Sequence, residues 1–180
     1  GLTTDTAPTL AAVLDRYASG DLLGALAAYP AGRPLAGDAE RALLAALNLA
    51  VGNVDEALGW LEGIPPSTLP GRVAAALRRQ IRAVQFQSCA DETGAPAPTL
   101  GSEWLALSYC QQAGQDLAAA LESARRATVV APRSGFAWVR VAELEFSFGR
   151  TGPAAEALER SLDLAPANAQ ALCLRGFLLA

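Results

Sequence analysis

The chain has 180 residues, of which 52% are hydrophobic, and a net charge of −4 at pH 7. The length fits one domain or a short repeat array. The negative charge argues against binding of nucleic acid, which needs a basic face. Because the sequence contains no His, the commonest general base and a common metal ligand, we expect no enzyme activity, bound metal or cofactor. No apolar run approaches the roughly 18 residues of a membrane-spanning helix, so we expect no direct membrane insertion.

Residues 6–64 predict two weakly repeated helix pairs. Small and apolar residues recur with an offset of 32 residues: Gly20, Ala25 and Tyr29 match Gly52, Ala57 and Leu61. The segment 52–61 has the pattern of the turn and second helix of such a pair. Proline-containing segments at 30–34 and 64–71 break the chain between units.

Residues 71–99 predict an unpaired helix followed by a loop. Apolar residues recur at helical spacing on one side of 72–87, and no neighbouring segment is an obvious partner for them. Glycine and prolines between 88 and 99 indicate the loop. The helix also carries four arginines: Arg72, Arg78, Arg79 and Arg82. On a chain of net negative charge, these favour a solvated face with local ion pairs over a basic patch for phosphate or an acidic partner.

The segments 101–134 and 135–168 are two copies of a 34-residue unit, and a further copy begins at 169. Matching positions carry similar residues: Trp104 and Trp138, Ser108 and Ala142, Ala120 and Ala154, Pro132 and Pro166. The fourth, seventh, eighth and eleventh positions form one stripe of a first helix. The eighth and twentieth positions are small, as two closely crossing helices require, and the proline ends the second helix.

This pattern resembles the tetratricopeptide repeat, W-x2-L-G-x2-Y followed by A, F and P, over 101–180 and less closely over 6–64. The resemblance implies a single all-α domain over 1–180, a right-handed superhelical solenoid of antiparallel helix pairs whose first helices line a concave groove. It also implies a scaffold that binds a partner peptide or protein in that groove. By repeat position, the groove residues are Leu105, Tyr109, Gln112, Phe136, Val139, Arg140, Glu143, Phe146, Cys173 and Phe177.

The segment 132–150 is also similar to repeats attached to FecR-type domains in bacterial envelope proteins. That similarity implies a location outside the cytoplasm, so of the cytoplasm and the periplasm we favour the periplasm or cell envelope. It keeps a second function open, a structural spacer or self-assembly segment of a longer envelope protein. The apolar positions Leu105, Tyr109 and Val139 favour binding over the spacer. The Lys and Asn of chaperone-binding family members are absent from the matching positions, so chaperone binding is not expected.

Some of these residues have two interpretations. Trp104 and Trp138 could stack on a ligand, but the fourth repeat position favours packing between helices. Arg140 and Glu143 lie three residues apart. They could grip a polar group of a ligand, or form an ordinary pair along the helix worth about 0.2–0.5 kcal/mol.

The three cysteines, Cys89, Cys110 and Cys173, are an odd and widely spaced set. They fit neither a disulfide framework nor paired metal-ligand spacing, so we interpret them as small, buried or half-buried hydrophobic side chains. Cys89 lies near Asp91 and Glu92. Without a His or a second Cys nearby, it has no activating base and too few metal ligands.

The segment 171–180 is apolar nearly all round, and Arg175 is its only charged residue. Repeat arrays normally end with a helix whose outer face is polar, so we expect the native protein to continue beyond residue 180. In the isolated chain, we expect the surface around Leu172, Phe177 and Leu179 to drive self-association into a homo-oligomer.

Overall fold

The computed structural model describes residues 10–89 and 97–179. Within these residues the chain forms ten helices and no strand, which confirms the predicted all-α class. In chain order the helices are α1 (Ala11–Ser19), α2 (Leu22–Ala27), α3 (Asp38–Ala50), α4 (Val54–Leu61), α5 (Leu69–Val84), α6 (Gly101–Ala113), α7 (Leu117–Val130), α8 (Gly135–Ser147), α9 (Thr151–Leu164) and α10 (Ala169–Leu179). The start of the first weak pair, 6–9, and part of the predicted loop, 90–96, lie outside the described residues.

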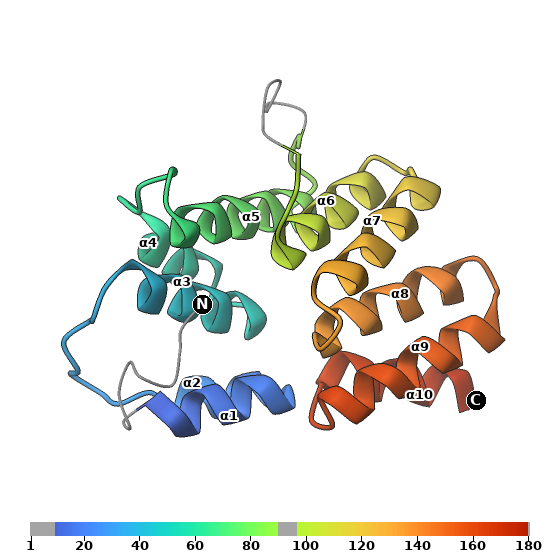
Figure 1. Ribbon diagram of the computed structural model, residues 1–180, viewed down its shortest axis with the longest axis horizontal. Helices are drawn as coiled ribbons and strands as arrows, with labels where there is room; N and C mark the ends of the chain where they lie inside the picture. The colour runs from blue at the N-terminus through green and yellow to red at the C-terminus, as the bar shows by residue number, and fades with distance from the viewer. Residues whose placement is uncertain (1–9, 90–96, 180) are drawn as a thin grey trace.

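The helices follow one another along an arch, with α1 and α2 at one end and α9 and α10 at the other (Figure 1). Each helix packs mainly against its neighbours in the chain. The buried apolar side chains therefore form three clusters along the arch instead of one central core. One cluster lies among α1, α2 and α3, a second among α3, α4 and α5, and a third among α7, α8, α9 and α10.

The helix predicted to be unpaired, α5, packs against both α3 and α6, so this prediction is wrong. Neither neighbour is related to α5 by the repeat, which is why comparing copies did not reveal them. Across the α5–α6 contact, Arg72 Nη2 lies 2.6 Å from Glu103 Oε2, a local ion pair of the kind predicted for this helix. Burial would raise the pKa of Glu103, but hydrogen bonds from Arg72 and from the amides of Thr99 and Leu100 hold it below its ordinary value.

The helices of the C-terminal half recur at the 34-residue spacing seen in the sequence. Helices α6 and α8 begin at Gly101 and Gly135 and have 13 residues each, and α7 and α9 have 14 residues each. Both glycines lie where another helix approaches closely. A Cβ at Gly101 would lie 2.8 Å from Ala131 Cβ, and one at Gly135 would lie 2.6 Å from Ala165 Cβ. The same close contact thus occurs twice, one repeat apart.

Small residues fill the helix crossings of this half. Ser108, Ala120, Ala142 and Ala154 have no exposed surface, as expected at the eighth and twentieth repeat positions. A longer side chain at any of them would have to displace a neighbouring helix. The partly buried Trp138 packs against the same cluster, in agreement with a packing role.

A buried carboxylate anchors the N-terminal end of the arch. Glu40 accepts hydrogen bonds from the Tyr29 hydroxyl at 2.6 Å, from Arg33 Nε at 2.8 Å and from the Ala36 amide at 2.7 Å. Burial would raise the pKa of Glu40, but these hydrogen bonds lower it below its ordinary value. Burial and the contact with Glu40 raise the pKa of Tyr29 to about 12. The segment that follows α2 is thereby held against α3.

Replacing Ala120 with Leu should destabilise the protein, because the added methyl groups would enter a crossing that has no space. Overpacking of this kind costs about 1–3 kcal/mol of the free energy of unfolding. The matched control is Ala118→Leu, since Ala118 lies on the same helix and is exposed. Chemical denaturation of both variants provides the measurement. Equal stability of the two would mean that α7 does not cross its neighbour at Ala120.

Candidate partner-binding cavity

A cavity of about 650 Å³, partly open to solvent, lies on the inner side of the arch. Residues of α1, α2, α3, α5, α6, α8 and α10 line it, whereas α4, α7 and α9 contribute none of its lining. The lining is mostly apolar. Its one charged residue in the described part of the chain is Asp21, which pairs with Arg16 at 3.0 Å. The cavity therefore offers a ligand an apolar wall without an unpaired charge.

Uncharged polar side chains interrupt this apolar wall: Tyr17, Gln80, Ser102, Tyr109, Ser134, Asn168 and Gln170. Burial raises the pKa of Tyr109, and the nearby carboxylate of Glu143 raises it further. Tyr17 is 36% exposed, and desolvation of its hydroxyl by the surrounding protein raises its pKa as well. Both phenols thus remain protonated and neutral at physiological pH, so they can act as hydrogen-bond donors without adding charge.

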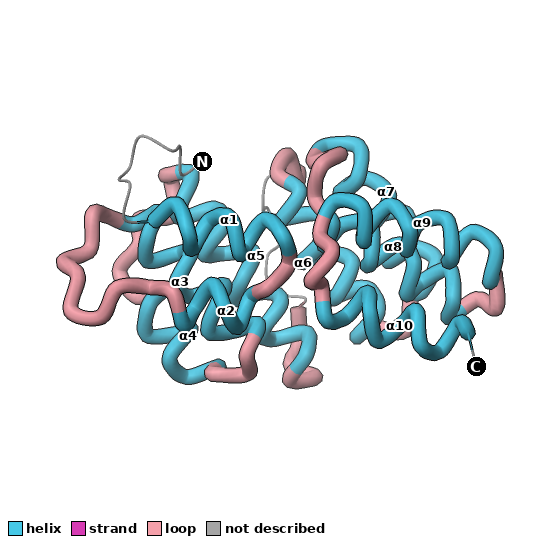
Figure 2. The backbone as a smooth tube through the Cα atoms, turned by 90° about the horizontal axis from the view of Figure 1, so that it is seen from below, coloured by secondary structure: helices cyan, strands magenta, loops and turns pink. Residues whose placement is uncertain are grey.

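The two ends of the arch meet, which closes it into a ring (Figure 1 and Figure 2). We call this contact of the end of α1 with the α9–α10 turn and the start of α8 the seam. The Ala167 amide donates a hydrogen bond to the Ser19 carbonyl at 2.9 Å, and the rings of Tyr17 and Phe136 lie 5.7 Å apart. Gly20 has φ +87°, and a Cβ there would lie 2.7 Å from the backbone nitrogen of Asn168. The seam therefore requires glycine at this position.

Asn168 lies at the seam with a donor that has no partner. Its Oδ1 accepts hydrogen bonds from the amides of Gln170 and Ala171 at 3.1 and 3.3 Å, which fixes the orientation of the carboxamide. The Nδ2 atom is buried and has no hydrogen-bond partner among the described residues. Leaving a buried donor unsatisfied costs about 1–3 kcal/mol. Asn168 is therefore an unfavourable feature of the structure beside the seam.

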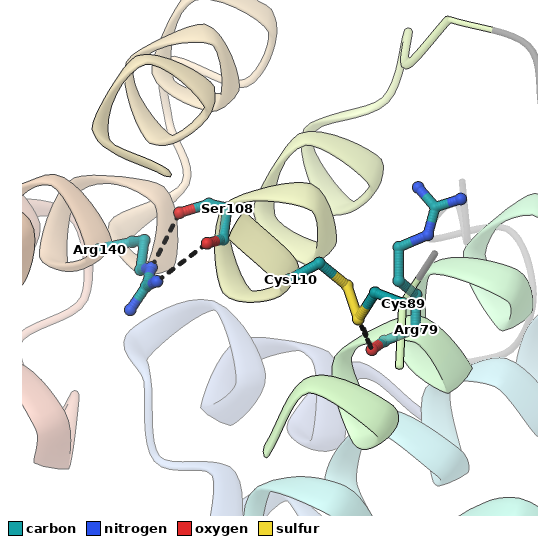
Figure 3. The surroundings of a disulfide bond; sticks show 5 residues. All are labelled: Arg79, Cys89, Ser108, Cys110 and Arg140. Atoms are coloured by element: carbon teal, nitrogen blue, oxygen red, sulfur yellow. Dashed lines mark hydrogen bonds between the residues drawn. A yellow bond between two sulfur atoms is a disulfide. The ribbon is translucent and has the colours of Figure 1, made fainter. Parts of the chain in front are cut away.

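A buried arginine connects α8 to α6. Arg140 donates from Nε to the Ser108 hydroxyl at 3.0 Å and from Nη2 to the Ser108 carbonyl at 3.3 Å (Figure 3). Its Nη2 also donates to the Gln112 side chain at 2.5 Å. Its guanidinium lies 3.9 Å from the centre of the Tyr109 ring, and its Nη1 lies 3.3 Å from Glu143 Oε2. Because the side chain is only 3% exposed, these contacts satisfy most of its donors within the protein. Arg140 therefore holds two helices together, and few of its hydrogen-bond donors remain for a ligand.

The predicted groove residues divide into three groups. Those that line the cavity are Leu105, Tyr109 and Phe136. Those that pack or bond within the protein are Gln112, Val139, Arg140, Glu143 and Phe146. Those that are exposed on α10, outside the cavity, are Cys173 and Phe177.

Two of these placements differ from the prediction for physical reasons. Val139 is 1% exposed and belongs to the core cluster, so it cannot line a groove. The repeat position assigned it an inner-facing role, whereas in this chain that face of α8 packs against neighbouring helices. On α10, only the first turn, with Ala169 and Gln170, reaches the cavity, and Cys173 and Phe177 lie beyond it.

Several cavity residues were not predicted from the sequence. Tyr17 comes from the N-terminal pair, Gln80 from α5, and Asn168 from a turn. They meet the predicted residues only because the arch closes into a ring. The sequence carries no local signal for a contact between opposite ends of the chain, although Gly20 could be read as a turn residue.

Cys89 and Cys110 form a disulfide, with their Cα atoms 5.8 Å apart, and Cys173 is a free, exposed thiol. Cys89 and Cys110 are half-buried as expected, but the expectation that they are unpaired is wrong, and the expected burial of Cys173 is wrong as well. The bond joins the segment that follows α5 to the C-terminal half of α6 (Figure 3). The Cys110 sulfur lies 3.7 Å from the Arg79 carbonyl oxygen. Because a disulfide sulfur has no proton to donate, this is a van der Waals contact.

No known family model matches the sequence, and no curated protein matches it. Within residues 10–89 and 97–179, no cluster of three or more His, Cys, Asp or Glu side chains is suited to hold a metal ion. None of the helices in that part of the chain combines the length and the apolar character needed to span a membrane. The cavity, the seam and the disulfide are therefore the features from which a function can be argued.

Replacing Gly20 with Ala should open the seam, because the added Cβ would clash with the backbone at Asn168. Gly52→Ala is the matched control. Gly52 has φ +88°, and a Cβ there would meet no atom within 4 Å, so the control carries similar backbone strain, about 1 kcal/mol, without the clash. We expect a larger loss of stability for Gly20→Ala, and a larger radius of gyration by small-angle X-ray scattering. Identical behaviour of the two variants would contradict a closed seam.

The disulfide predicts a specific thiol count and a stability effect. The denatured protein should react with one equivalent of a thiol reagent before reduction, at Cys173, and with three after it. Reduction should lower the free energy of unfolding by about 3 kcal/mol, as expected for a closed loop of 21 residues. Denaturation with and without a phosphine reductant measures this loss, and the Cys173→Ser variant should lose the same amount. Three reactive thiols before reduction would contradict the bond.

Proposed function

We propose that the chain is a tetratricopeptide-like interaction domain, a right-handed superhelix of antiparallel helix pairs whose inner cavity holds a short, uncharged segment of a partner protein. The observation that carries the proposal is the cavity itself, about 650 Å³ in volume, to which seven helices contribute and whose lining is apolar and neutral apart from Asp21, which is paired with Arg16. The 34-residue recurrence of helix boundaries and of the close contacts at Gly101 and Gly135 supports the repeat class.

The size and chemistry of the cavity suit a small part of a partner. Its volume lies within the range of roughly 300–1,000 Å³ that is common for ligand pockets. Burial of apolar side chains against Tyr17, Leu105 and Phe136 would contribute about 25 cal/mol per Å², before the cost of ordering the segment. A charged side chain would lose its hydration and find no unpaired opposite charge, so it would be rejected.

The structural spacer or self-assembly segment remains the alternative. It is supported by the exposed apolar side chains of α10, where Leu172, Phe177 and Leu179 are 39%, 66% and 82% exposed. Homo-oligomerisation through this surface stays a prediction. The disulfide supports a location in an oxidising compartment, which agrees with the preference for the periplasm or cell envelope.

The proposal is tested by selecting random hexapeptides displayed on phage against the oxidised protein. We expect enrichment of uncharged, apolar peptides, which should bind the protein in solution as synthetic peptides. Ala46→Trp should abolish that binding, since the half-buried Ala46 lines the cavity and an indole would fill it. The matched control, Ala118→Trp, alters an exposed alanine outside the cavity and should bind normally.

Two outcomes would count against the proposal. If no peptide is enriched above a library background, the spacer becomes the better interpretation. If peptides bind the Ala46→Trp variant as tightly as the wild type, the binding surface lies outside the cavity. Light scattering with and without Leu179→Glu would then establish whether α10 is that surface.

A further inference from the structure

The ring has two joints between its halves. In the described part of the chain, the one extensive packing contact between α1–α5 and α6–α10 is that of α5 against α6. The second joint is the seam, which consists of a backbone hydrogen bond, one aromatic contact and a close approach at Gly20. The cavity lies between these joints. The geometry of one joint therefore limits the geometry of the other.

The disulfide is located at the first joint. Cys89 follows α5 and Cys110 belongs to α6, so the bond fixes the end of one helix to the side of the next. Both cysteines are half-buried rather than enclosed in the core, which leaves them within reach of a reagent. In the same contact, the backbone carbonyl of Arg79 on α5 lies against the Cys110 sulfur.

A continuous chain of contacts leads from the disulfide to the seam. Cys110 and Ser108 are two residues apart, so they lie on nearly opposite sides of α6; Ser108 accepts the hydrogen bond from Arg140 on α8 (Figure 3). Arg140 and Phe136 are four residues apart and so share a face of α8. Phe136 then meets the ring of Tyr17 on α1. The helix tied to α5 by the disulfide, α6, thus contacts α8 through Arg140, and α8 carries Phe136 to the seam.

We propose that the Cys89–Cys110 disulfide is a redox site that keeps the seam closed, and that its reduction by a dithiol opens the ring. A thiolate of the dithiol attacks one sulfur, the S–S bond breaks, and the other cysteine leaves as a thiolate. The second thiol of the reagent then displaces the first cysteine. The protein gains two electrons and two protons as two thiols, and the dithiol becomes a disulfide.

The seam is suited to such a release. Beside it, Asn168 Nδ2 is buried without a hydrogen-bond partner among the described residues, an unfavourable feature of the structure. Once the disulfide is broken, α6 and α8 can shift together relative to α5, and the weak seam yields before the helix cores do. In consequence, and this step rests on the proposed function, a partner segment would enter and leave the cavity faster from the reduced protein.

The Ala167 amide provides a direct readout, because it is hydrogen-bonded only across the seam, to Ser19. Its hydrogen exchange is measured by NMR in a Cys173→Ser background, which removes the free thiol. Reduction with dithiothreitol should speed exchange at Ala167 by about tenfold. The Leu158 amide lies in the core cluster and exchanges only through global unfolding, so its rate reports the lower stability of the reduced protein and should stay below that of Ala167 in both redox states. Reoxidation should restore protection at both amides. The double variant Cys89→Ser/Cys110→Ser should behave like the reduced protein without added reductant.

A second variant separates coupling from general destabilisation. In Gly20→Ala the seam should already be open, so reduction should add little further exchange at Ala167. In Gly52→Ala reduction should act as in the wild type. Unchanged exchange at Ala167 on reduction, or exchange at Ala167 that is no faster than at Leu158 in the reduced protein, would overturn the proposal. The exchange measurements need no peptide. Their outcome is therefore independent of the peptide-binding test, and either proposal can fail while the other holds.

Discussion

The close approach of helices through small residues is the constraint on which the rest of the structure depends. Where α8 begins, a Cβ at Gly135 would lie 3.1 Å from the Ser161 carbonyl oxygen, and the Ser161 hydroxyl donates to the Gly135 carbonyl at 2.8 Å. Alanines without exposed surface lie at the crossings. The apolar clusters also contain Leu, Ile and Val side chains, but at the glycine and alanine positions the absence of a longer side chain lets neighbouring helices approach closely. The arch then curves enough for its ends to meet around a cavity.

Charge is distributed so that the cavity remains neutral while the helices around it are held by buried ions. Arg140 finds a hydroxyl, a carboxamide, an aromatic ring and a carboxylate within the protein. On the next turn of the same helix, the nearly buried Glu145 binds both Arg125 and Arg150. Such buried ions are costly unless they are paired. Their pairing stiffens the frame, and neither Arg140 nor Glu145 belongs to the cavity lining.

The sequence predicted what depends on local spacing. The 34-residue period located the helices of 101–168, and repeat position predicted the burial of Ala120 and Ala154 because a crossing requires a small residue. The partner helices of α5, the Cys89–Cys110 bond and the seam could not be predicted, because each joins segments unrelated by the repeat. Val139, which the repeat position assigned to the groove, is buried in the core for a related reason. A repeat position specifies one face of a helix, but the curvature of the whole array decides whether that face is exposed to solvent or buried in the core.

Closure of the seam changes how this chain reaches its native state. An open repeat array folds through contacts between neighbours, so formation can start in any unit and spread, and the terminal units fray independently. Here Ser19 and Ala167 must meet from opposite ends of the chain, and contacts between distant residues form slowly because a long loop must close first. The final step of folding is therefore ring closure, and fraying of the first helix and of the α9–α10 turn becomes a single cooperative event.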